Sequence, residues 1–185
     1  MNKEYFQELS NIFSRIEATG AKGNILPLAQ AEELILKTLK NLRTAQGKLI
    51  FIGNGGSAAL ASHLATDFLR NAGMNSITFN DPVLITTISN DFGYEQVFAK
   101  PLEAIAQEGD ILFALSSSGK SKNILNAVRK ARDKRCFIVT LSGFTQDNPL
   151  RQMGDINIYA PSHSYGYVEI AHLSLCHSLA EQMKA

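Results

Sequence analysis

The sequence lacks three features: a long hydrophobic run, an excess of charge of either sign, and a patterned set of cysteines. No apolar run approaches the roughly 20 residues that a helix needs to span a bilayer, and the amphipathic, partly acidic start MNKEYFQELSN does not resemble a signal peptide. A net charge of +1 excludes a general attraction to nucleic acid or to an anionic membrane. Cys136 and Cys176 lie in apolar surroundings without a metal or redox spacing, which predicts a reduced cytoplasmic protein.

The chain has an ordinary globular composition, 45% apolar and 19% charged, in 185 residues. This length, with no repeat or linker, predicts a single domain over residues 1–185. Its first 46 residues form a helical extension, because apolar residues recur there at helical spacing in two segments. The first set is Tyr5, Phe6, Leu9, Ile12, Phe13 and Ile16; the second, after the break GAKGN and Pro27, is Leu28, Ala31, Ile35, Leu39 and Leu42.

The remaining sequence alternates short apolar runs with helical stretches. The runs, rich in β-branched residues and typical of strands buried on both faces, are 48–53, 75–79, 110–115, 136–141 and 156–160. The helical stretches are 57–70, 94–106, 121–133 and 166–184. This alternation predicts an α/β fold, a three-layer doubly wound sandwich with a five-stranded parallel sheet. Ligands bind such sheets beyond the carboxyl ends of the strands, so the loops after the first and third strands are the candidates for a site.

The loop after the first strand reads Gly53-Asn54-Gly55-Gly56-Ser57 and leads into a helix. Glycines let backbone N–H groups approach an anion, and a helix N-terminus adds partial positive charge. The spacing is neither the dinucleotide GxGxxG nor a P-loop, because the third glycine and the GK[ST] element are absent. A tight strand-to-helix turn with Ser57 as N-cap explains the same residues.

The loop after the third strand is the stronger candidate for a phosphate site. It contains four serines around one glycine just before a helix: Ser116, Ser117, Ser118 and Ser121. Their hydroxyls and the backbone N–H groups can converge on one small anion. Ser121 alone could cap the helix, but one cap does not explain the other three serines. A phosphate monoester is the expected ligand of this donor-rich loop.

Ionisable residues on two helices form a candidate metal or acid–base site. His63 and Asp67 are four residues apart and share a helical face, which is also typical of a solvated polar stripe. The strongly apolar last helix contains Glu169, His172 and His177, and buried ionisable groups are costly unless they are paired or bind a metal. Together, His63, Asp67, Glu169 and His177 would give two nitrogen and two oxygen ligands, which suits zinc or a similar divalent ion.

The spacing on the last helix limits this ligand set. Glu169 and His177 are separated by about 12 Å along a regular helix, so one ion reaches both only with extended side chains or an irregular helix start. His172 points about 140° away from His177 and is expected to be a packed or supporting histidine.

Taken together, these motifs resemble a sugar-isomerase (SIS) domain, specifically the phosphoheptose isomerase family. The resemblance covers nearly the whole chain and rests on GNGGS with a downstream helical histidine (53–63), SNDFGYEQVFAK (89–100), EGDILFALSSSGKSKN (108–123) and EIAHLSLCH (169–177). It implies a flavodoxin-like strand order. It also implies an enzyme that converts sedoheptulose 7-phosphate to D-glycero-D-manno-heptose 7-phosphate, towards lipopolysaccharide or capsule heptose. The family forms a homotetramer with active sites at subunit interfaces, into which the N-terminal extension would pack, and often binds one zinc per subunit.

Carried over by position, the resemblance implies the roles of the site residues. The phosphate contacts are Ser116, Ser117, Ser118 and Ser121. The contacts with the sugar chain are Asn54, Gly55, Gly56, Ser57, Asn90, Asp91 and Glu169. The metal positions are His63, Asp67, Glu169 and His177. Among these residues, Asp67 and His177 are the expected acid–base pair of a cis-enediol mechanism.

Three features depart from the family pattern. The family has glutamate where this chain has Asp67, glutamine where it has Glu169, and ARIQE where it has SYGYVEI. A positional change of about 1 Å can cost on the order of a hundredfold in rate. Two alternatives therefore stand beside the heptose phosphate isomerase: an isomerase of another sugar phosphate, and a non-catalytic SIS protein that binds a replication initiator or another protein. Glu169 and His177 disfavour the non-catalytic alternative, and the lack of a helix-turn-helix or basic patch disfavours a sugar-sensing regulator.

Overall fold

The computed structural model describes residues 3–21 and 23–184, so Lys22 of the GAKGN break lies outside the described residues, as do residues 1–2 and 185. The helices are α1 (Lys3–Ser14), α2 (Leu28–Ala45), α3 (Gly56–Ala72), α4 (Pro82–Phe92), α5 (Ala99–Ile105), α6 (Lys122–Asp133) and α7 (Tyr165–Gln182), with 3₁₀ turns η1 (Tyr94–Gln96) and η2 (Pro149–Gln152). The strands are β1 (Glu17–Gly20), β2 (Ile25–Leu26), β3 (Lys48–Gly53), β4 (Asn75–Thr78), β5 (Ile111–Ser116), β6 (Phe137–Ser142) and β7 (Ile156–Tyr159).

One seven-stranded sheet with the order β2-β1-β7-β6-β5-β3-β4 forms the middle of the molecule. The five strands from β3 to β7 are parallel and follow the order 2-1-3-4-5 when numbered among themselves. This confirms the doubly wound α/β fold and its flavodoxin-like order. Every residue of β5 is buried, as expected for a central strand covered on both faces.

The five parallel strands are present as predicted, but the sheet has seven strands, because β1 and β2 form an antiparallel hairpin that extends it beside β7. In the register of this extension Ala18 pairs with Ile158, and Asn157 Nδ2 donates to the carbonyl of Thr19. Helix α1 ends at Ser14, so Ile16 lies outside the helix in which it was predicted. Strands of four and two residues are too short to show a period of two, which is why the sequence pattern missed them.

Helix α4 is a second element that the sequence pattern missed, although its start carries a recognisable signal. Asp81 is the N-cap and its Oδ1 accepts the backbone N–H of Leu84 at 2.9 Å, while Pro82 occupies the first helical turn. The predicted helix over 94–106 is in fact divided into η1 and α5. The predicted helices over 57–70, 121–133 and 166–184 agree with the structure within two residues at each end.

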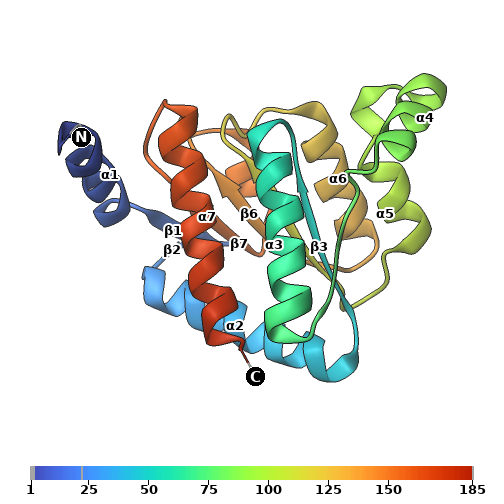
Figure 1. The fold of residues 1–185 in the computed structure, drawn as a ribbon, viewed down its shortest axis with the longest axis horizontal. Coiled ribbons are helices and arrows are strands. Elements are labelled where there is room, and N and C mark those ends of the chain that lie inside the picture. The colour runs from blue at the N-terminus through green and yellow to red at the C-terminus, as the bar shows by residue number, and fades with distance from the viewer. Residues whose placement is uncertain (1–2, 22, 185) are drawn as a thin grey trace.

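The helices cover the two faces of the sheet in separate layers (Figure 1). Phe51 and Phe113 point towards the layer of α2, α3 and α7, with their ring centroids 5.0 Å apart. Their neighbours Ile50 and Leu112 point the opposite way, into the layer that contains α4, α5 and α6. Each fully buried side chain of this size stabilises the fold by about 1.5–3 kcal/mol relative to an exposed one. Helix α1 projects from this body at the left of the view (Figure 1).

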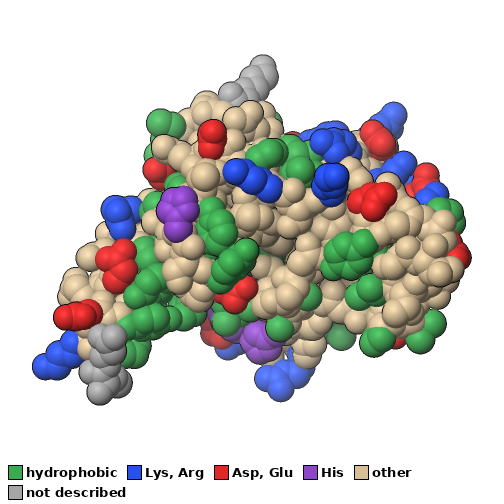
Figure 2. All heavy atoms as spheres, turned by 90° about the horizontal axis from the view of Figure 1, so that it is seen from above, with side chains coloured by type: hydrophobic (Ala, Val, Ile, Leu, Met, Phe, Trp, Pro, Cys, Tyr) green, Lys and Arg blue, Asp and Glu red, His purple; other side chains and the backbone are tan. Residues whose placement is uncertain are grey.

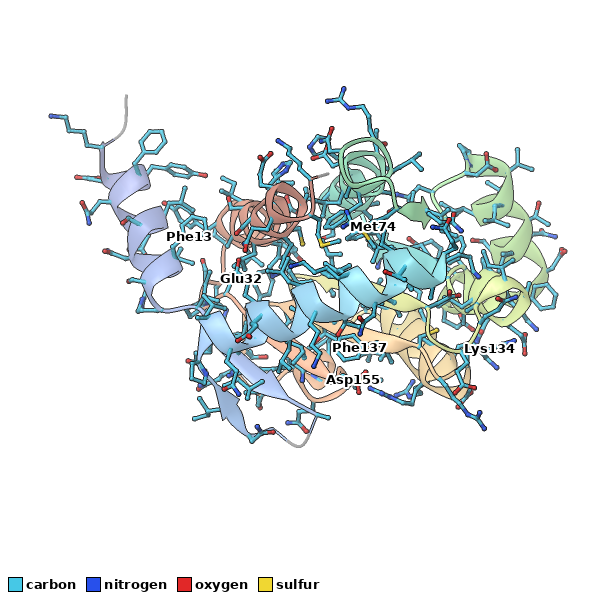
Figure 3. The ribbon with its side chains drawn as sticks, turned by 90° about the horizontal axis from the view of Figure 1, so that it is seen from below. Phe13, Glu32, Met74, Lys134, Phe137 and Asp155 are labelled. Atoms are coloured by element: carbon cyan, nitrogen blue, oxygen red, sulfur yellow. The ribbon has the colours of Figure 1, made fainter. Side chains whose placement is uncertain are left out.

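Helices α3 and α7 run side by side in the same direction, from the carboxyl end of the sheet downwards (Figure 1). At the opposite end α2 crosses beneath them, and Glu32 lies between α2 and α7 (Figure 3). Its Oε1 accepts hydrogen bonds from Ser178 Oγ at 3.0 Å and from Gln182 Nε2 at 2.6 Å. Arg43 donates from the same helix to the carbonyl of Met183 at 2.9 Å. These contacts fix the C-terminal end of α7 and therefore the height of its side chains relative to α3.

Among the described residues, no helix combines the length and the apolar character that a membrane span requires.

Candidate active site

A cavity of about 390 Å³ opens at the carboxyl ends of β3 and β5. These strands are parallel neighbours in which Gly53 pairs with Leu115, so the loops after both leave the sheet at the same edge. The cavity is lined by Asn54, Gly55, Gly56, Ser57, Leu115, Ser116, Ser117, Ser118, Ser121, Tyr165 and Glu169. The fold thus brings the two predicted loops together and adds the start of α7 as a third wall.

The serine loop has hydroxyl groups that are not committed to the fold. Ser121 is the N-cap residue of α6, as the sequence allowed, but its side chain makes no capping bond and instead accepts a long hydrogen bond from Ser116 Oγ at 3.5 Å. The buried Ser117 hydroxyl has no hydrogen-bond partner in the part of the chain that the structure describes. Uncapped N–H groups and free hydroxyls at a helix start are suited to an anion.

Positive charge borders this loop. Lys120 and Lys122 flank Ser121 in this loop and are exposed. Figure 2 looks onto this end of the molecule and shows Lys and Arg side chains gathered along one side of it. Exposed cations beside a donor-rich cavity attract an anionic ligand and raise its association rate.

The glycine loop forms the opposite wall of the cavity. Gly55 is the N-cap residue of α3, at φ 54°, so the alternative in which Ser57 caps the helix is wrong. Ser57 is instead buried in the first turn of α3 and lines the cavity. Gly56 faces the carboxylate of Glu169 so closely that a Cβ atom at this position would overlap with it. Glycine at position 56 therefore leaves room for Glu169 against the start of α3.

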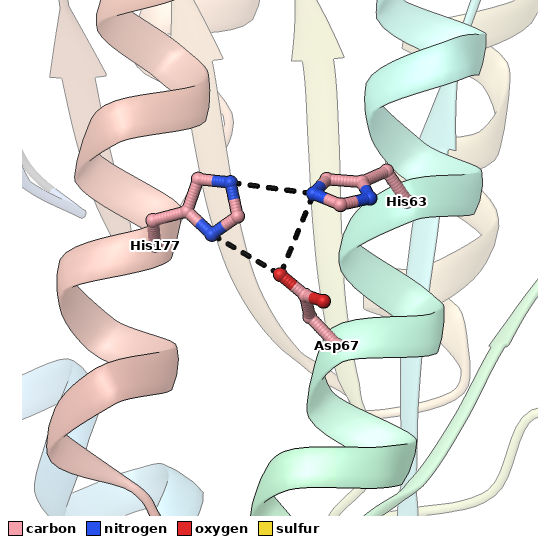
Figure 4. Close-up of side chains that lie close together, drawn as sticks. All are labelled: His63, Asp67 and His177. Carbon is pink, nitrogen blue, oxygen red and sulfur yellow. Dashed lines mark hydrogen bonds and ion pairs between the residues drawn. The ribbon is translucent and has the colours of Figure 1, made fainter.

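Three ionisable side chains meet between α3 and α7, about two helical turns below the cavity (Figure 4). His177 Nδ1 lies 3.1 Å from Asp67 Oδ2, and His63 Nε2 lies 3.5 Å from the same oxygen. The two imidazoles approach each other at 3.3 Å through their Nε2 atoms. The side chain of Asp67 is 18% exposed, whereas those of His63 and His177 are 54% and 39% exposed, so solvent or a ligand can reach the histidines. We call these three residues the His–Asp–His cluster.

The donors of this cluster fit a divalent metal. One ligand atom from each residue lies within 4.8 Å of the other two, so the residues can converge on one ion. In a tetrahedral zinc site with bonds of about 2.0–2.2 Å, ligand atoms lie roughly 3.3–3.6 Å apart. His63 Nε2 lies at such distances from Asp67 Oδ2, 3.5 Å, and from His177 Nε2, 3.3 Å, whereas the 3.1 Å contact with Asp67 is made by the other nitrogen of His177, Nδ1. Three protein ligands with a fourth position open are the arrangement of catalytic zinc sites.

Glu169, the fourth predicted ligand, lies outside this cluster. Its carboxylate lines the cavity beside Gly56, at the N-terminal end of α7. The helix between Glu169 and His177 is regular, so the eight intervening steps separate them by about 12 Å along its axis. The structure therefore groups Glu169 with the two loops and not with the histidines.

Asn90 and Asp91 are predicted sugar contacts that the structure does not bring to the cavity. Both lie exposed in the last turn of α4, where Asn90 Nδ2 donates to Asp91 Oδ1 at 2.9 Å. Neither residue lines the cavity between the two loops.

Two polar residues at the site were not identified from the sequence. Tyr165, 62% exposed, forms part of the rim, and its ring meets Phe144 edge-on with centroids 4.8 Å apart. Asn123, in the first turn of α6, hydrogen-bonds to Asn54 across the two loops. Its position directly after the serine loop was the available signal, but its contact with Asn54 depends on the pairing of β3 with β5.

His172 is a packed histidine, as its direction on the helix predicted. It is fully buried, its Nε2 donates to the carbonyl of Ser142 at 3.1 Å, and Nδ1 has no partner among the described residues. Burial disfavours the charged imidazole and lowers the pKa of His172 to about 4, although the hydrogen bond to Ser142 partly opposes the shift. His172 is therefore neutral at physiological pH and supports the fold.

We expect His172 to make the protein less stable in mild acid. His172 takes up a proton near pH 6.5 in the unfolded chain but only near pH 4 in the folded chain. Its contribution to the free energy of unfolding is therefore complete above pH 6.5 and is lost as the pH falls towards 4. The full loss is on the order of 3 kcal/mol, from 1.36 kcal/mol per pKa unit. Urea unfolding at pH 7.5 and 5 should show a shallower pH dependence for His172→Gln, which keeps a donor but does not titrate. An equal slope in both proteins would contradict this expectation.

Comparisons with known proteins give a consistent result. The family model of the SIS domain matches residues 4–143. The phosphoheptose isomerase of Helicobacter hepaticus is 35% identical over 160 residues, which cover 83% of this chain and 79% of that one. The solved structure of a phosphoheptose isomerase from Francisella tularensis has a TM-score of 0.84 at 27% identity and covers 98% of this chain and 95% of that chain. The structure of the phosphoheptose isomerase GmhA from Neisseria gonorrhoeae has the same TM-score at 25% identity, with 97% and 95% covered.

Proposed function

We propose, for a chain that belongs to the SIS domain family and within it to the phosphoheptose isomerases, that the cavity between its two loops receives sedoheptulose 7-phosphate. The enzyme is an aldose–ketose isomerase that forms D-glycero-D-manno-heptose 7-phosphate for heptose synthesis. The observation that carries the assignment of the site is the convergence of the serine loop and the glycine loop above the His–Asp–His cluster.

The phosphate end of the substrate binds the serine loop. Hydroxyl groups of the serine loop and the first N–H groups of α6, which Ser121 does not cap, donate to it, and Lys120 and Lys122 add favourable charge. From Gly56 to His63 helix α3 advances about 10 Å, a length that an extended seven-carbon chain ending in a phosphate can span. The carbons next to the phosphate then lie beside the glycine loop, and C1 and C2 lie nearer the cluster.

Isomerisation moves a proton between C1 and C2 through a cis-enediol, and the chain supplies an acid and a base for it. The carboxylate of Asp67 carries the proton between the two carbons, and the imidazole of His177 exchanges a proton with the neighbouring oxygens. Their 3.1 Å contact lets His177 hold the Asp67 carboxylate in position. The shorter side chain of Asp67, where the family has glutamate, sets this pair closer to α3.

We also propose that a zinc ion binds His63, Asp67 and His177. Two imidazole nitrogens and one carboxylate oxygen form a typical zinc donor set, and the histidines are accessible to solvent. When bound, zinc supplies Lewis-acid polarisation of the substrate's carbonyl and hydroxyl oxygens. Glu169 remains a substrate contact in this proposal, because its carboxylate lies in the cavity.

The homotetramer implied by the family completes the site in this proposal. Large apolar side chains are exposed on α1 and near α4, which suits contacts between subunits: Phe6, Val83, Phe92 and Tyr94. Asn90 and Asp91 lie away from the cavity of their own chain and would serve at a subunit interface. The free, buried cysteines Cys136 and Cys176 agree with a cytoplasmic location.

One experiment on the purified full chain tests activity and metal together. The protein is incubated with sedoheptulose 7-phosphate, fructose 6-phosphate and ribulose 5-phosphate, the aldose products are followed by NMR, and bound metal is quantified. We expect conversion of the seven-carbon substrate with the highest kcat/KM, and about one zinc per chain. Faster conversion of a shorter ketose phosphate would contradict the heptose assignment, and a lack of any conversion would contradict the isomerase.

A further inference from the structure

Two carboxamides join the loops that form the cavity. Asn54 Nδ2 donates to Asn123 Oδ1 at 2.9 Å, and Asn123 Nδ2 donates back to Asn54 Oδ1 at 2.8 Å. Asn54 follows β3 in the glycine loop, whereas Asn123 lies in α6 directly behind the serine loop. This reciprocal pair therefore connects residues 69 positions apart in the sequence and fixes the distance between the two loops.

A third side chain completes the arrangement around Asn54. Tyr94 Oη donates to Asn54 Oδ1 at 3.0 Å. A carboxamide oxygen has two lone pairs, and those of Asn54 are now used by Asn123 and Tyr94. The Asn54 side chain has one N–H left to offer. Asn54 lines both the main cavity and a smaller one of about 300 Å³ next to Tyr94.

Asn123 is itself held in one orientation. It is 3% exposed, and its Oδ1 also accepts the backbone N–H of Ile124 at 3.0 Å. If the Asn123 carboxamide were rotated by 180°, its NH₂ group would face the N–H of Ile124, and two donors would then oppose each other. The orientation of Asn123 thus determines which end of the Asn54 carboxamide faces each neighbour.

We propose that Asn123 and Tyr94 are positioning residues, which hold Asn54 so that it presents a single N–H donor, and no acceptor, to the substrate. This inference rests on the proposed function and adds the chemistry of one contact: the partner of Asn54 is a substrate oxygen with a lone pair or a negative charge. Two donors on Oδ1 polarise the carboxamide and strengthen the bond that the remaining N–H makes. The same three residues hold the glycine loop and the serine loop in register.

Two nearly isosteric substitutions separate these contacts. Tyr94→Phe removes one donor to Asn54 and is expected to lower kcat/KM roughly threefold to tenfold. Asn123→Asp still accepts from Asn54 Nδ2 and Ile124 N–H, but places a carboxylate oxygen opposite Asn54 Oδ1. It should lower kcat/KM roughly 10- to 100-fold. Asp133→Asn, at the exposed C-terminal end of the same helix, is the matched control and should leave kcat/KM unchanged.

A double-mutant cycle shows whether these residues act through Asn54. In an Asn54→Ala background, Tyr94→Phe and Asn123→Asp should cause no further loss of kcat/KM, because the group that they position is gone. A general structural role would instead give the same additional loss in both backgrounds, and that result would overturn the inference. Unfolding midpoints of all variants show whether a loss of activity reflects a loss of fold.

The side-chain amide signals of Asn54 in an NMR spectrum give a readout that does not depend on turnover. Both substitutions should shift these signals, whereas Asp133→Asn should not. Shifted signals in a protein that isomerises no sugar phosphate would contradict the proposed function and leave the hydrogen-bond arrangement standing. Unshifted signals in an active enzyme would overturn the inference alone.

Discussion

Replacement of His177 by asparagine is expected to lower kcat for sedoheptulose 7-phosphate by about 10²- to 10⁴-fold, the usual contribution of a positioned acid or base. Asparagine retains polarity but cannot exchange a proton near neutral pH. Asp67→Asn should cause a loss of similar size, because Asp67 Oδ2 is the atom that both histidines of the cluster approach. Steady-state kinetics of each variant, with the wild type measured in parallel, give the values.

Three comparisons make this expectation specific. His163→Asn is the matched control, because His163 is exposed, stacks on Phe144 and lies outside the His–Asp–His cluster. Asp67→Glu keeps the carboxylate and restores the residue of the family, so it should lose far less activity than Asp67→Asn. Both asparagine variants should also bind less zinc while their unfolding midpoints change little. Wild-type kcat in either asparagine variant would show that the pair does not carry the proton transfer.

Replacement of Gly119 by alanine is expected to disrupt the serine loop and the stability of the fold together. Gly119 has a φ of 62°, and a Cβ atom there would overlap with the carboxamide of Asn148. Asn148 cannot move away, because it is fully buried and donates to Ser142 Oγ, to the Thr145 carbonyl and to the Gly143 carbonyl. Left-handed strain and overpacking together should cost about 2–5 kcal/mol, which lowers the unfolding midpoint by roughly 4–20 °C.

The matched control for Gly119 is Gly73, the C-cap of α3. Gly73 has nearly the same φ, 61°, but an added Cβ atom would meet nothing within 4 Å. Gly73→Ala should therefore cost only the strain, about 1–2 kcal/mol, and should leave KM unchanged. Gly119→Ala should also raise KM for the sugar phosphate, because the serine loop must shift. Equal destabilisation by the two substitutions would show that the contact with Asn148 has no energetic weight.

The sequence alone was sufficient to predict the parallel part of the sheet and the edge at which the site lies. The run ILFAL, residues 111–115, is apolar at every position, as expected of a strand covered on both faces. Once β3 and β5 are parallel strands of one sheet, their loops must leave at the same edge, so the glycine loop and the serine loop meet. The pair His63 and Asp67 follows from the helical period in the same way.

Other features depended on contacts that no local period contains. The hairpin of β1 and β2 is stabilised by its pairing with β7, more than 130 residues away along the chain, and its own strands are too short to show a pattern. Likewise, the pairing of Asn54 with Asn123 exists only because two loops approach across neighbouring strands.

The separation of Glu169 from the histidines is the clearest case. The sequence placed Glu169 and His177 on one helix with two turns between them. It did not determine the position of α7 along its axis relative to α3, and this position decides which residues of the two helices meet. In the structure Glu169 lies opposite Gly56 and His177 opposite His63 and Asp67. The sequence by itself thus determined the five parallel strands, the two loops and which residues carry reactive groups, because these follow from local patterns. The grouping of those residues into a cavity and a metal-suited cluster was decided by helix packing, because side chains from separate helices meet only where the core fixes both helices.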